Sequence, residues 1–437
     1  MSLSTQPYKG TRDFYPEDKR LQKYMFSKWR EVFELFGYEE YDAPTLEPTE
    51  LYLAKGNEEI IQEQTYTFMD RGERSVTMRT EMTPSVSRMV AGKRQELPYP
   101  LRWYSIPNLF RYERPQKSRL REFWQPNVDI FGIAGIEAEQ EIIQVADAVI
   151  LSFGSKRTMY SIRLNNRALM DFINRDYLGL DSVQSSTLIR LIDRMNKLES
   201  AAFKGLVDSI FSPSQRDSGL SKKLDVILAA KTIKDLPKEV AASEPAQKLA
   251  ALLNLLHVQG ISNAIYDPTL MRGFDYYTDI VFEVFDTHPD NNRAMFGGGR
   301  YDGLIGQFGV EPVPSVGFAF GDAGFQNFLD AHELMPPLRS ETDIYAILIG
   351  DVYERSIKAI SELRESGVKV AIDMTGRKMD KQIKNALKKN IPYVMFIGEQ
   401  ELESEHFKLK NLELSNEETH TLGRIISIVK DQRRRSL

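Results

Sequence analysis

One strand-like segment places polar residues where a buried strand would carry apolar ones. Residues 110–132 read FRYERPQKSRLREFWQPNVDIFG, and the second half of this segment alternates polar and apolar residues. Successive side chains of a strand point to opposite faces, so Gln125, Asn127 and Asp129 share one face of the predicted strand. A solvated sheet face would explain this pattern, and so would a site for a small polar ligand.

The first half of the same segment is rich in cations. The stretch 113–121 joins two predicted strands, and it is long for a hairpin loop; long loops in compact domains are usually functional. Guanidinium groups stay charged and match phosphate oxygens as planar forks. Arg111 before this loop and Arg272 in MRGFDYYTDIVFEV are therefore candidate phosphate ligands. The structural alternative for each is an ion pair, with Glu113 or Asp275.

Length and composition limit the classes of protein. A chain of 437 residues exceeds one ordinary core, which predicts two or three domains. The net charge of -5 argues against a protein that wraps nucleic acid with its whole surface, so any such contact must come from local basic patches. The absence of cysteine excludes disulfides and thiolate metal sites. No membrane-length apolar run or signal peptide is apparent, and we expect a cytoplasmic enzyme without membrane contact.

Hydrophobic periodicity divides the chain into three kinds of structure. A helix is predicted at 18–36, followed by strands and helices to about 165, and strand patterns return between 260 and 330. Residues 168–256 follow helical patterns and predict an all-helical insertion. The glycine-rich FGGGRYDGL is interpreted as a tight turn. After a polar linker at 335–343, strands alternate with helices, which predicts a small parallel sheet flanked by helices.

A basic patch lies in the last part of the chain. Six cations and one acid occur between residues 377 and 389, and Lys381, Lys384 and Lys388 fall on one face of a predicted helix. A solvated helix face is the default interpretation. Together with the cationic loop and the RRR tail at 433–435, the patch would suit contacts to a long polyanion such as nucleic acid.

Four segments together resemble histidyl-tRNA synthetases, which are class II aminoacyl-tRNA synthetases: KGTRDFYPED, RYERPQKSRLREFWQPNVDIFG, RGFDYYTDIVFEV and GGGRYDGL. The resemblance covers nearly the whole chain. It implies an α+β catalytic domain with a mixed, mainly antiparallel six- to seven-stranded sheet, a helical insertion and a C-terminal α/β anticodon-binding domain. We expect the catalytic domain at 1–167 and 257–334, the insertion at 168–256, the anticodon-binding domain at 343–437, and a homodimer formed through residues 18–44.

The same resemblance implies a ligase of protein biosynthesis. Such an enzyme attaches histidine to tRNA(His) in an ATP-dependent reaction, with Mg²⁺, through a histidyl-adenylate. The lack of a P-loop and of a histidine pair for metal agrees with phosphates held by arginines. One alternative is a regulatory paralogue without charging activity, although such paralogues generally lack the anticodon-type domain. Another is a non-enzymatic RNA-binding module, suggested by the basic patches alone.

Carried over to this sequence, the family pattern assigns roles to individual residues. Those expected to bind histidine are Glu81, Thr83, Gln125, Asp129, Arg272, Tyr276, Tyr277 and Tyr301. Those expected to bind ATP are Arg111, Glu113, Arg119 and Phe123. Arg111 and Arg272 would act in catalysis at the α-phosphate. Contacts to tRNA are expected from Gln116, Lys381, Lys384 and Lys388, and no protein ligand set for a metal is expected.

Three departures from the family pattern affect the expected site. The family usually has R-P-E-G-T where this chain has RTEMT. Asp129 stands where a longer glutamate usually reads the imidazole ring. Gly324, in GFAFGDAGF, takes the place of an arginine that clamps ATP, and Arg300 or a metal ion is a candidate to replace that cation.

Overall fold

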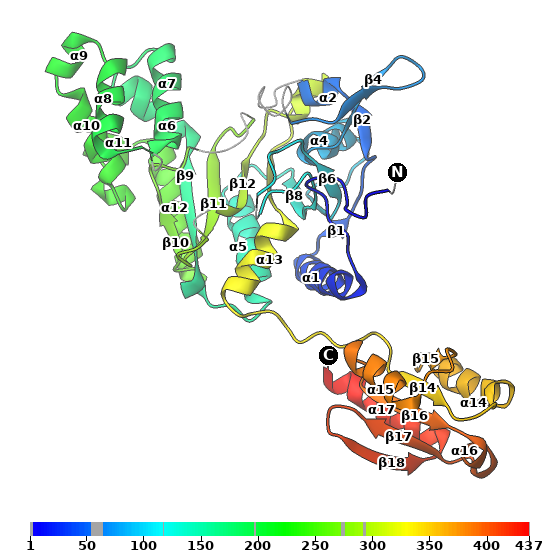
Figure 1. The fold of residues 1–437 in the computed structure, drawn as a ribbon. Helices are drawn as coiled ribbons and strands as arrows, with labels where there is room; N and C mark the ends of the chain where they lie inside the picture. Colours follow the sequence, from blue (N-terminus) through cyan, green and yellow to red (C-terminus); the bar gives the residue numbers. More distant parts are fainter. Residues whose placement is uncertain are drawn as a thin grey trace. The chain divides into compact units, whose positions relative to one another are not determined.

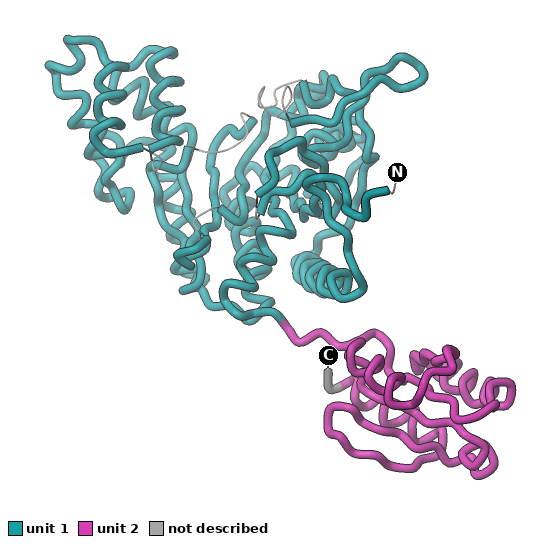
Figure 2. Tube along the Cα trace, viewed as in Figure 1, with its two compact units in different colours: residues 1–335 teal, residues 336–437 magenta. Residues whose placement is uncertain are grey.

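The chain forms two compact units in a computed structural model, residues 1–335 and 336–437 (Figure 2). The structure describes residues 3–53, 64–116, 118–195, 198–271, 276–291 and 294–436. The break between the units falls where the sequence changes to the polar stretch that begins with Met335. The boundaries predicted for the separate domains stay predictions.

A mainly antiparallel eight-stranded sheet forms the centre of the first unit (Figure 1). In spatial order its strands are β1 (Glu39–Glu40), β5 (Leu101–Ser105), β8 (Asn127–Phe131), β13 (Ser315–Phe320), β12 (Ala294–Arg300), β11 (Ile280–Asp286), β9 (Tyr160–Asn166) and β10 (Ala264–Tyr266). The predicted sheet class is confirmed. It has more than the expected six or seven strands because the short β1 and β10 extend its two edges by parallel pairing.

Helices cover one face of this sheet and make the main core. They are α1 (Pro16–Leu35), α5 (Glu137–Leu151), α12 (Glu244–Val258) and α13 (Asp322–Ala331). Trp29 of α1 makes edge contacts with Phe320 and Phe325, at centroid distances of 5.1 and 5.5 Å. Phe296 and Phe320 stack with centroids 4.1 Å apart. These aromatic contacts hold the strands on the face of the sheet that the helices cover, and these helices leave the opposite face uncovered.

Smaller elements surround the other face of the sheet. They are β2 (Leu46–Pro48), α2 (Glu50–Leu53), β3 (Thr67–Met69), β4 (Ser75–Met78), α4 (Thr83–Gly92), β6 (Asn108–Phe110) and β7 (Glu122–Trp124). The segment RTEMT lies after β4 rather than in a strand, and Thr83 opens α4. Val86 and Val90 of α4 pack with Phe131 and Tyr301, so α4 closes one side of this face.

Helices dominate the described residues between β9 and β10, as the periodicity predicts (Figure 1). They are α6 (Arg167–Phe172), α7 (Ser182–Asp193), α8 (Ser200–Ile210), α9 (Pro213–Asp217), α10 (Leu220–Ala229) and α11 (Lys238–Ala241), followed by α12. Leu188, Phe203 and Leu224 are buried between them. The chain then returns through α12, which packs on β9 and β10.

The second unit is a five-stranded sheet with helices against it. Its strands in spatial order are β15 (Val370–Asp373), β14 (Ile344–Leu348), β16 (Tyr393–Ile397), β17 (Phe407–Asn411) and β18 (Asn416–His420). The helices are α14 (Tyr353–Glu365), α15 (Met379–Lys388), α16 (Glu399–Ser404) and α17 (Leu422–Ser436). The purely parallel sheet was an incomplete prediction, because β17 and β18 add an antiparallel hairpin. Strand β18 is largely exposed and polar, so it carries no hydrophobic alternation.

The tight turn predicted in the glycine-rich FGGGRYDGL is present in its second half, at residues 302–304, and not at the run of three glycines. Gly297, Gly298 and Gly299 lie inside β12, between β11 and β13. A Cβ atom on Gly298 would lie 2.5 Å from the carbonyl oxygen of Gly317 and 2.6 Å from Cβ of Phe318. Close packing, and not chain reversal, therefore requires glycine here.

None of the helices formed by the described residues has both the length and the apolar character needed to cross a membrane.

The two neighbouring glycines predict unequal effects on stability. We expect Gly298→Ala to lower the free energy of unfolding by about 2 kcal/mol or more, because backbone atoms must move to admit the methyl group. Gly297→Ala is the matched control, since the nearest atom to its Cβ is 4.0 Å away. All three tryptophans lie in the first unit, so tryptophan fluorescence during denaturant unfolding reports on it. Equal effects of the two substitutions would contradict this packing.

Candidate functional site

Small residues create space over the centre of the sheet, on the face opposite α5. The strand register places Asp129 opposite Gly317, and Gly317 opposite Gly299. In the next row, Asn127 faces Ala319, which faces Gly297. A Cβ atom on Gly317 would lie 2.0 Å from Oδ1 of Asp129, so the carboxyl group occupies the space of the missing side chain.

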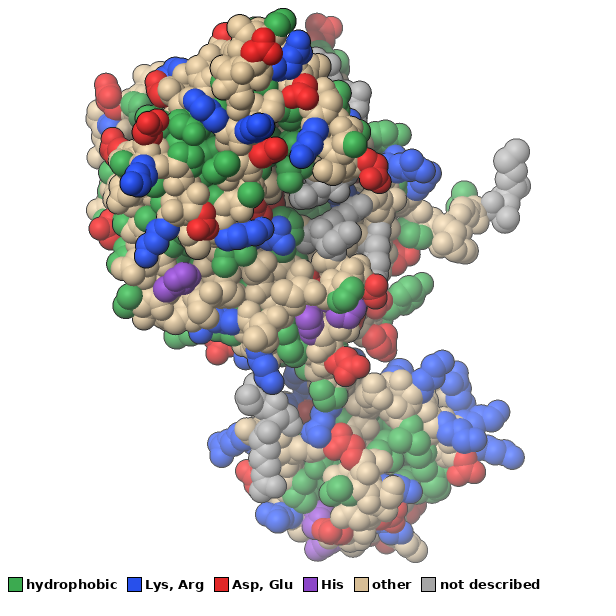
Figure 3. Space-filling view, turned by 90° about the vertical axis from the view of Figure 1, so that its left-hand side faces the viewer, with side chains coloured by type: hydrophobic (Ala, Val, Ile, Leu, Met, Phe, Trp, Pro, Cys, Tyr) green, Lys and Arg blue, Asp and Glu red, His purple; other side chains and the backbone are tan. Residues whose placement is uncertain are grey.

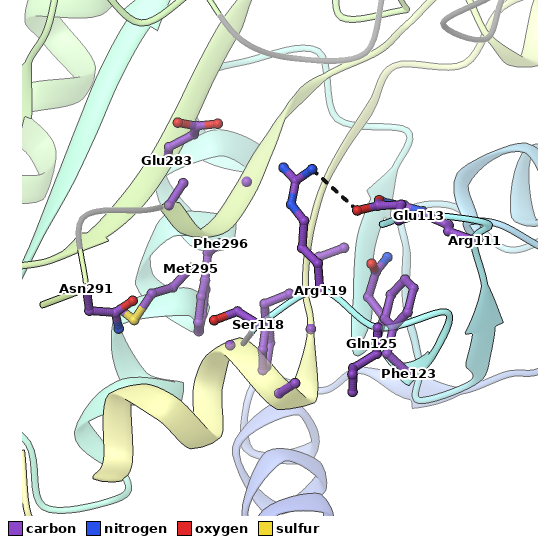
Figure 4. A pocket seen from close by; sticks show the side chains of 18 residues that line it. Arg111, Glu113, Ser118, Arg119, Phe123, Gln125, Glu283, Asn291, Met295 and Phe296 are labelled. Carbon is purple, nitrogen blue, oxygen red and sulfur yellow. Dashed lines mark hydrogen bonds and ion pairs between the residues drawn. The ribbon is translucent and has the colours of Figure 1, made fainter. Parts of the chain in front are cut away.

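A cavity of about 310 Å³ opens over this floor (Figure 4). Side chains from several elements line it, including Arg111, Glu113, Arg119, Phe123, Gln125 and Glu283. In Figure 4, Arg119 reaches into the middle of the cavity and Glu283 lies across from Arg111. The volume and the mixed lining suit a small polar ligand.

The two arginines of the cavity are held differently. Nε of Arg111 donates to the carbonyl oxygen of Thr80 at 2.9 Å, and its guanidinium carbon lies 5.4 Å from the centroid of Phe123. The side chain of Arg119 is 53% exposed and its guanidinium pairs with Glu113 at 3.3 Å. Glu113 thus pairs with Arg119, whereas the side chain of Arg111 is held at the cavity wall by its hydrogen bond to the backbone of Thr80.

A buried polar cluster adjoins the cavity beyond Gln125. The Tyr301 hydroxyl donates to Oδ1 of Asp129 at 2.5 Å, and Nδ2 of Asn127 donates to Oδ2 of Asp129 at 2.5 Å. The Tyr276 hydroxyl donates to Oε2 of Glu81 at 3.0 Å. Asp129 is 1% exposed, so the polar face of β8 is buried and the explanation of a solvated sheet face is wrong.

Burial controls the acidity of this cluster. It raises the pKa of Asp129 to about 7, against the hydrogen bonds from Tyr301 and Asn127 that favour the ionised form. Burial also raises the pKa of Glu81, while the nearby Arg111 lowers it. The pKa of Tyr277 is raised by burial and then by the charges of Glu81 and Asp129, which places its hydroxyl in the field of both carboxyl groups.

The residues predicted to bind histidine and ATP largely meet in this region. The buried cluster and its margin contain Glu81, Thr83, Gln125, Asp129, Tyr276, Tyr277 and Tyr301. The cavity wall contains Arg111, Glu113, Arg119 and Phe123. Arg272 lies outside the described residues. Their individual roles remain predictions, because proximity does not assign a ligand.

The residues predicted to contact tRNA lie elsewhere. Gln116 is exposed in the loop before β7, where its backbone N–H donates to the carbonyl oxygen of Arg119 at 2.9 Å. Lys381, Lys384 and Lys388 are exposed on α15 in the second unit, and Lys and Arg side chains gather on one side of that unit in Figure 3.

Arg300 does not replace the missing cation at Gly324. Its side chain is 2% exposed and its Nε and Nη2 each donate to a carboxylate oxygen of Glu139 at 2.7 Å. It also donates to the carbonyl oxygens of Ile133 and Gly135. This arginine therefore ties β12 to α5 and its preceding turn, and the expectation that it could bind phosphate was wrong.

Gly324 itself faces open space. It lies in the first turn of α13 and lines the cavity, and no atom lies within 4 Å of a Cβ atom placed on it. Among the described residues of the lining, the cations are Arg111 and Arg119. Within the described lining, these two side chains are the cations that could offset the charge absent at Gly324.

Sequence reasoning missed an anchoring residue at the end of β11. The buried Asp286 accepts hydrogen bonds from Nδ2 of Asn291 at 2.8 Å and from Nε2 of His332 at 2.7 Å. Asn291 lines the cavity, so Asp286 holds one of its walls. The contact with His332 spans 46 residues, and no local pattern around Asp286 reveals it.

The chain matches known families over both units. A family model described as histidyl-tRNA synthetase matches residues 10–321. The chain belongs to the histidyl-tRNA synthetase family. A second model, described as an anticodon binding domain, matches residues 343–432.

Full-length relatives agree with membership in the histidyl-tRNA synthetase family. A protein named histidine–tRNA ligase from Leptospira biflexa is 40% identical over 435 residues, which are 98% of each chain. Another with this name, from Thermococcus kodakarensis, is 36% identical over 92% of this chain and 93% of its own.

Solved structures of histidyl-tRNA synthetases share the fold. The enzyme from Nostoc sp. PCC 7120 superposes with a TM-score of 0.82 at 21% identity, over 99% of this chain and 100% of that one. A protein from Bacillus halodurans C, described as an ATP phosphoribosyltransferase regulatory subunit/histidyl-tRNA synthetase, gives a TM-score of 0.73 at 22% identity, over 91% and 100%. At these identities the comparisons establish the fold alone.

Ionisation of Asp129 predicts a pH-dependent cost in stability. The pKa is about 7 in the folded chain and about 3.9 for an unperturbed aspartate, so the cost is absent below about pH 4 and grows as pH rises toward 7. At pH 8 the full difference between the two pKa values corresponds to a loss of about 4 kcal/mol in the free energy of unfolding. We expect Asp129→Asn to raise the unfolding midpoint at pH 8, with an advantage that shrinks toward pH 5.

Tryptophan fluorescence during thermal unfolding measures this difference. Asp330→Asn, at an exposed position of α13, is the matched control for the loss of one charge. A difference between Asp129→Asn and the native chain that does not vary with pH would contradict the raised pKa.

Proposed function

We propose that this chain is a histidine–tRNA ligase that forms AMP. It activates histidine with ATP to histidyl-adenylate and pyrophosphate, and then transfers the histidyl group to tRNA(His). The observation that carries this proposal is the buried cluster around Asp129 and Glu81 beside a cavity lined by Arg111 and Arg119. Carboxyl groups and hydroxyls suit a small amino acid, and guanidinium groups suit the phosphates of the nucleotide.

The buried cluster would hold histidine. Glu81 and Thr83 would bind its ammonium group, with Tyr276 completing the hydrogen bonds to both. Gln125 would contact the amino-acid end at the junction with the cavity. Asp129 would accept from a ring N–H, and Tyr277 would bind the other ring nitrogen, with Tyr301 lining the pocket. A site of paired donors and acceptors rejects side chains that leave its buried groups unpaired.

The cavity would hold ATP next to that histidine. Arg111 would lie at the α-phosphate, Arg119 at the distal phosphates, and Phe123 against the adenine with Glu113 beside it. The histidine carboxylate would attack the α-phosphorus, and pyrophosphate would leave. Arg111 would stabilise the charge that develops, and family resemblance adds Arg272 to this role and to binding the substrate carboxylate.

The residues of the cavity fit a magnesium ion that arrives with the nucleotide. Among the described residues there is no cluster of three or more ligands that could hold a metal by itself. Mg²⁺ commonly binds through one or two carboxylates together with substrate phosphates. Glu113 and Glu283 line the cavity and would supply those carboxylates. When bound, the ion would neutralise phosphate charge.

The partners follow from surfaces outside the cavity. Gln116 and the lysines of α15 would contact tRNA(His). A homodimer through residues 18–44 is supported by apolar side chains exposed there and just beyond, such as Leu35 at 79% and Leu46 at 47%. We place the enzyme in the cytoplasm, where charging of tRNA for protein synthesis takes place.

The regulatory paralogue is the weaker alternative. Its support is the missing cation at Gly324 and the regulatory description of the Bacillus halodurans neighbour. Against it stands the anticodon binding domain matched at 343–432. Charging of tRNA(His) with labelled histidine separates the two functions, because a paralogue would give none.

ATP–pyrophosphate exchange tests the proposed first step. We expect exchange that depends on histidine, and we expect Arg111→Ala to reduce its rate by about 100-fold, which corresponds to the loss of about 3 kcal/mol of charge stabilisation. Arg71→Ala, at an exposed turn between β3 and β4, is the matched control and should keep the native rate. Exchange without histidine, or a native rate for Arg111→Ala, would contradict the proposal.

The basic face of α15 predicts a separate effect on tRNA. We expect the triple change Lys381→Glu, Lys384→Glu and Lys388→Glu to weaken tRNA(His) binding at least 10-fold and to spare histidine-dependent exchange, because these residues lie in the second unit. Filter binding and exchange assays measure the two effects.

The matched control places the same charge change on scattered exposed lysines of the second unit, at Lys358, Lys408 and Lys430. Equal weakening by both triple variants would point to net charge instead of a defined surface.

A further inference from the structure

A row of polar side chains leads away from Asp129 toward the edge of the sheet. The backbone N–H of Tyr41 donates to the carbonyl oxygen of Tyr104 at 2.8 Å, which continues the parallel pairing of β1 with β5. Ser105 of β5 lies opposite Asn127 of β8. Tyr41, Ser105 and Asn127 therefore follow one another across three neighbouring strands, on the face that carries Asp129.

Two hydroxyls in this row are buried without a partner. In the described part of the chain, neither the Tyr41 hydroxyl nor the Ser105 hydroxyl has a hydrogen bond, and both oxygens are shielded from solvent. Burial raises the pKa of Tyr41 well above its ordinary value, and the charge of Asp129 adds to this, while polar contact with Ser105 and Asn127 offsets part of it. The Tyr41 hydroxyl thus lies beside Asn127 and within the field of the carboxyl group.

The hydrogen-bonding capacity of an ionised carboxylate determines which end of the Asn127 amide faces Asp129. A carboxylate accepts hydrogen bonds only, so the NH₂ end of Asn127 must face Asp129, as its 2.5 Å contact with Oδ2 has it. With Tyr301 donating to Oδ1, the carboxylate has a donor on each oxygen.

We propose that Asn127 is a positioning residue for histidine recognition. Asn127 holds the Asp129 carboxyl in the acceptor state and in one orientation, so the pocket accepts a side chain that offers a ring N–H. This inference rests on the proposed role of Asp129 in binding the imidazole ring.

The amide side chain of Asn127 is the first target. We expect Asn127→Ala and Asn127→Ser to raise the KM for histidine at least 10-fold in pyrophosphate exchange, with the KM for ATP within twofold of the native value. Asn127→Asp should raise the KM for histidine more at pH 8 than at pH 6, because the new carboxylate repels that of Asp129 and protonation at the lower pH relieves the repulsion. The serine variant keeps a polar group and covers the case in which the alanine variant folds poorly.

The hydroxyl of Tyr41 gives a matched control, because it is a buried polar group on the same face of the sheet that makes no hydrogen bond within the described residues. Tyr41→Phe should leave the KM for histidine within twofold of the native value and the unfolding midpoint unchanged or higher, since the hydroxyl that it removes is buried without a partner.

Two results would overturn the inference: a native KM for histidine in Asn127→Ala and Asn127→Ser, or a rise in that KM for Tyr41→Phe as large as the rise for the Asn127 variants. Asp129→Ala separates this failure from that of the proposed function. If Asp129→Ala leaves the KM for histidine unchanged, the assigned role of Asp129 is wrong. If it raises that KM while the Asn127 variants do not, the positioning role alone is wrong.

Discussion

The carboxyl group of Asp129 lies flat on the central sheet because Gly317, opposite it, has no side chain. A methyl group there would lie 2.0 Å from Oδ1. Strand β13, which contains Gly317, directs Phe318 and Phe320 toward the helices. A slip of β13 by one residue against β8 would therefore place a phenyl ring where the carboxyl group of Asp129 now lies. The whole site thus depends on one register of β8 and β13, and on the absence of a side chain at a single position.

The helical face of the sheet explains how that register is kept. Strands β12 and β13 direct stacked rings of Phe296 and Phe320 into the core, and Trp29 packs on them from α1. Arg300 at the end of β12 is joined to Glu139 of α5 by two hydrogen bonds in a fully buried setting. A buried ion pair contributes little net stability, but separating its partners is costly, so it resists sliding of β12 along α5.

The sequence predicted those features that local patterns encode. The alternation in QPNVDIF placed Gln125, Asn127 and Asp129 on one face, and helical spacing placed α1 within two residues of its bounds. The role of Arg300 could not be predicted, because its partner lies 161 residues away. The turn in FGGGRYDGL lies at residues 302–304, whereas Gly297–Gly299 are packed between β11 and β13, and a run of glycines does not by itself distinguish a turn from such close strand packing. The exposed strand β18 has no hydrophobic alternation from which it could be predicted.

Gly324 leaves part of the cavity wall bare, with nothing within 4 Å of the place a side chain would begin. A larger side chain at this position would take up room in the cavity. The bare patch therefore leaves space beside α13 into which an enlarged ligand could extend, and a ligand shaped to fill that space would distinguish this chain from one with a long side chain at the same place.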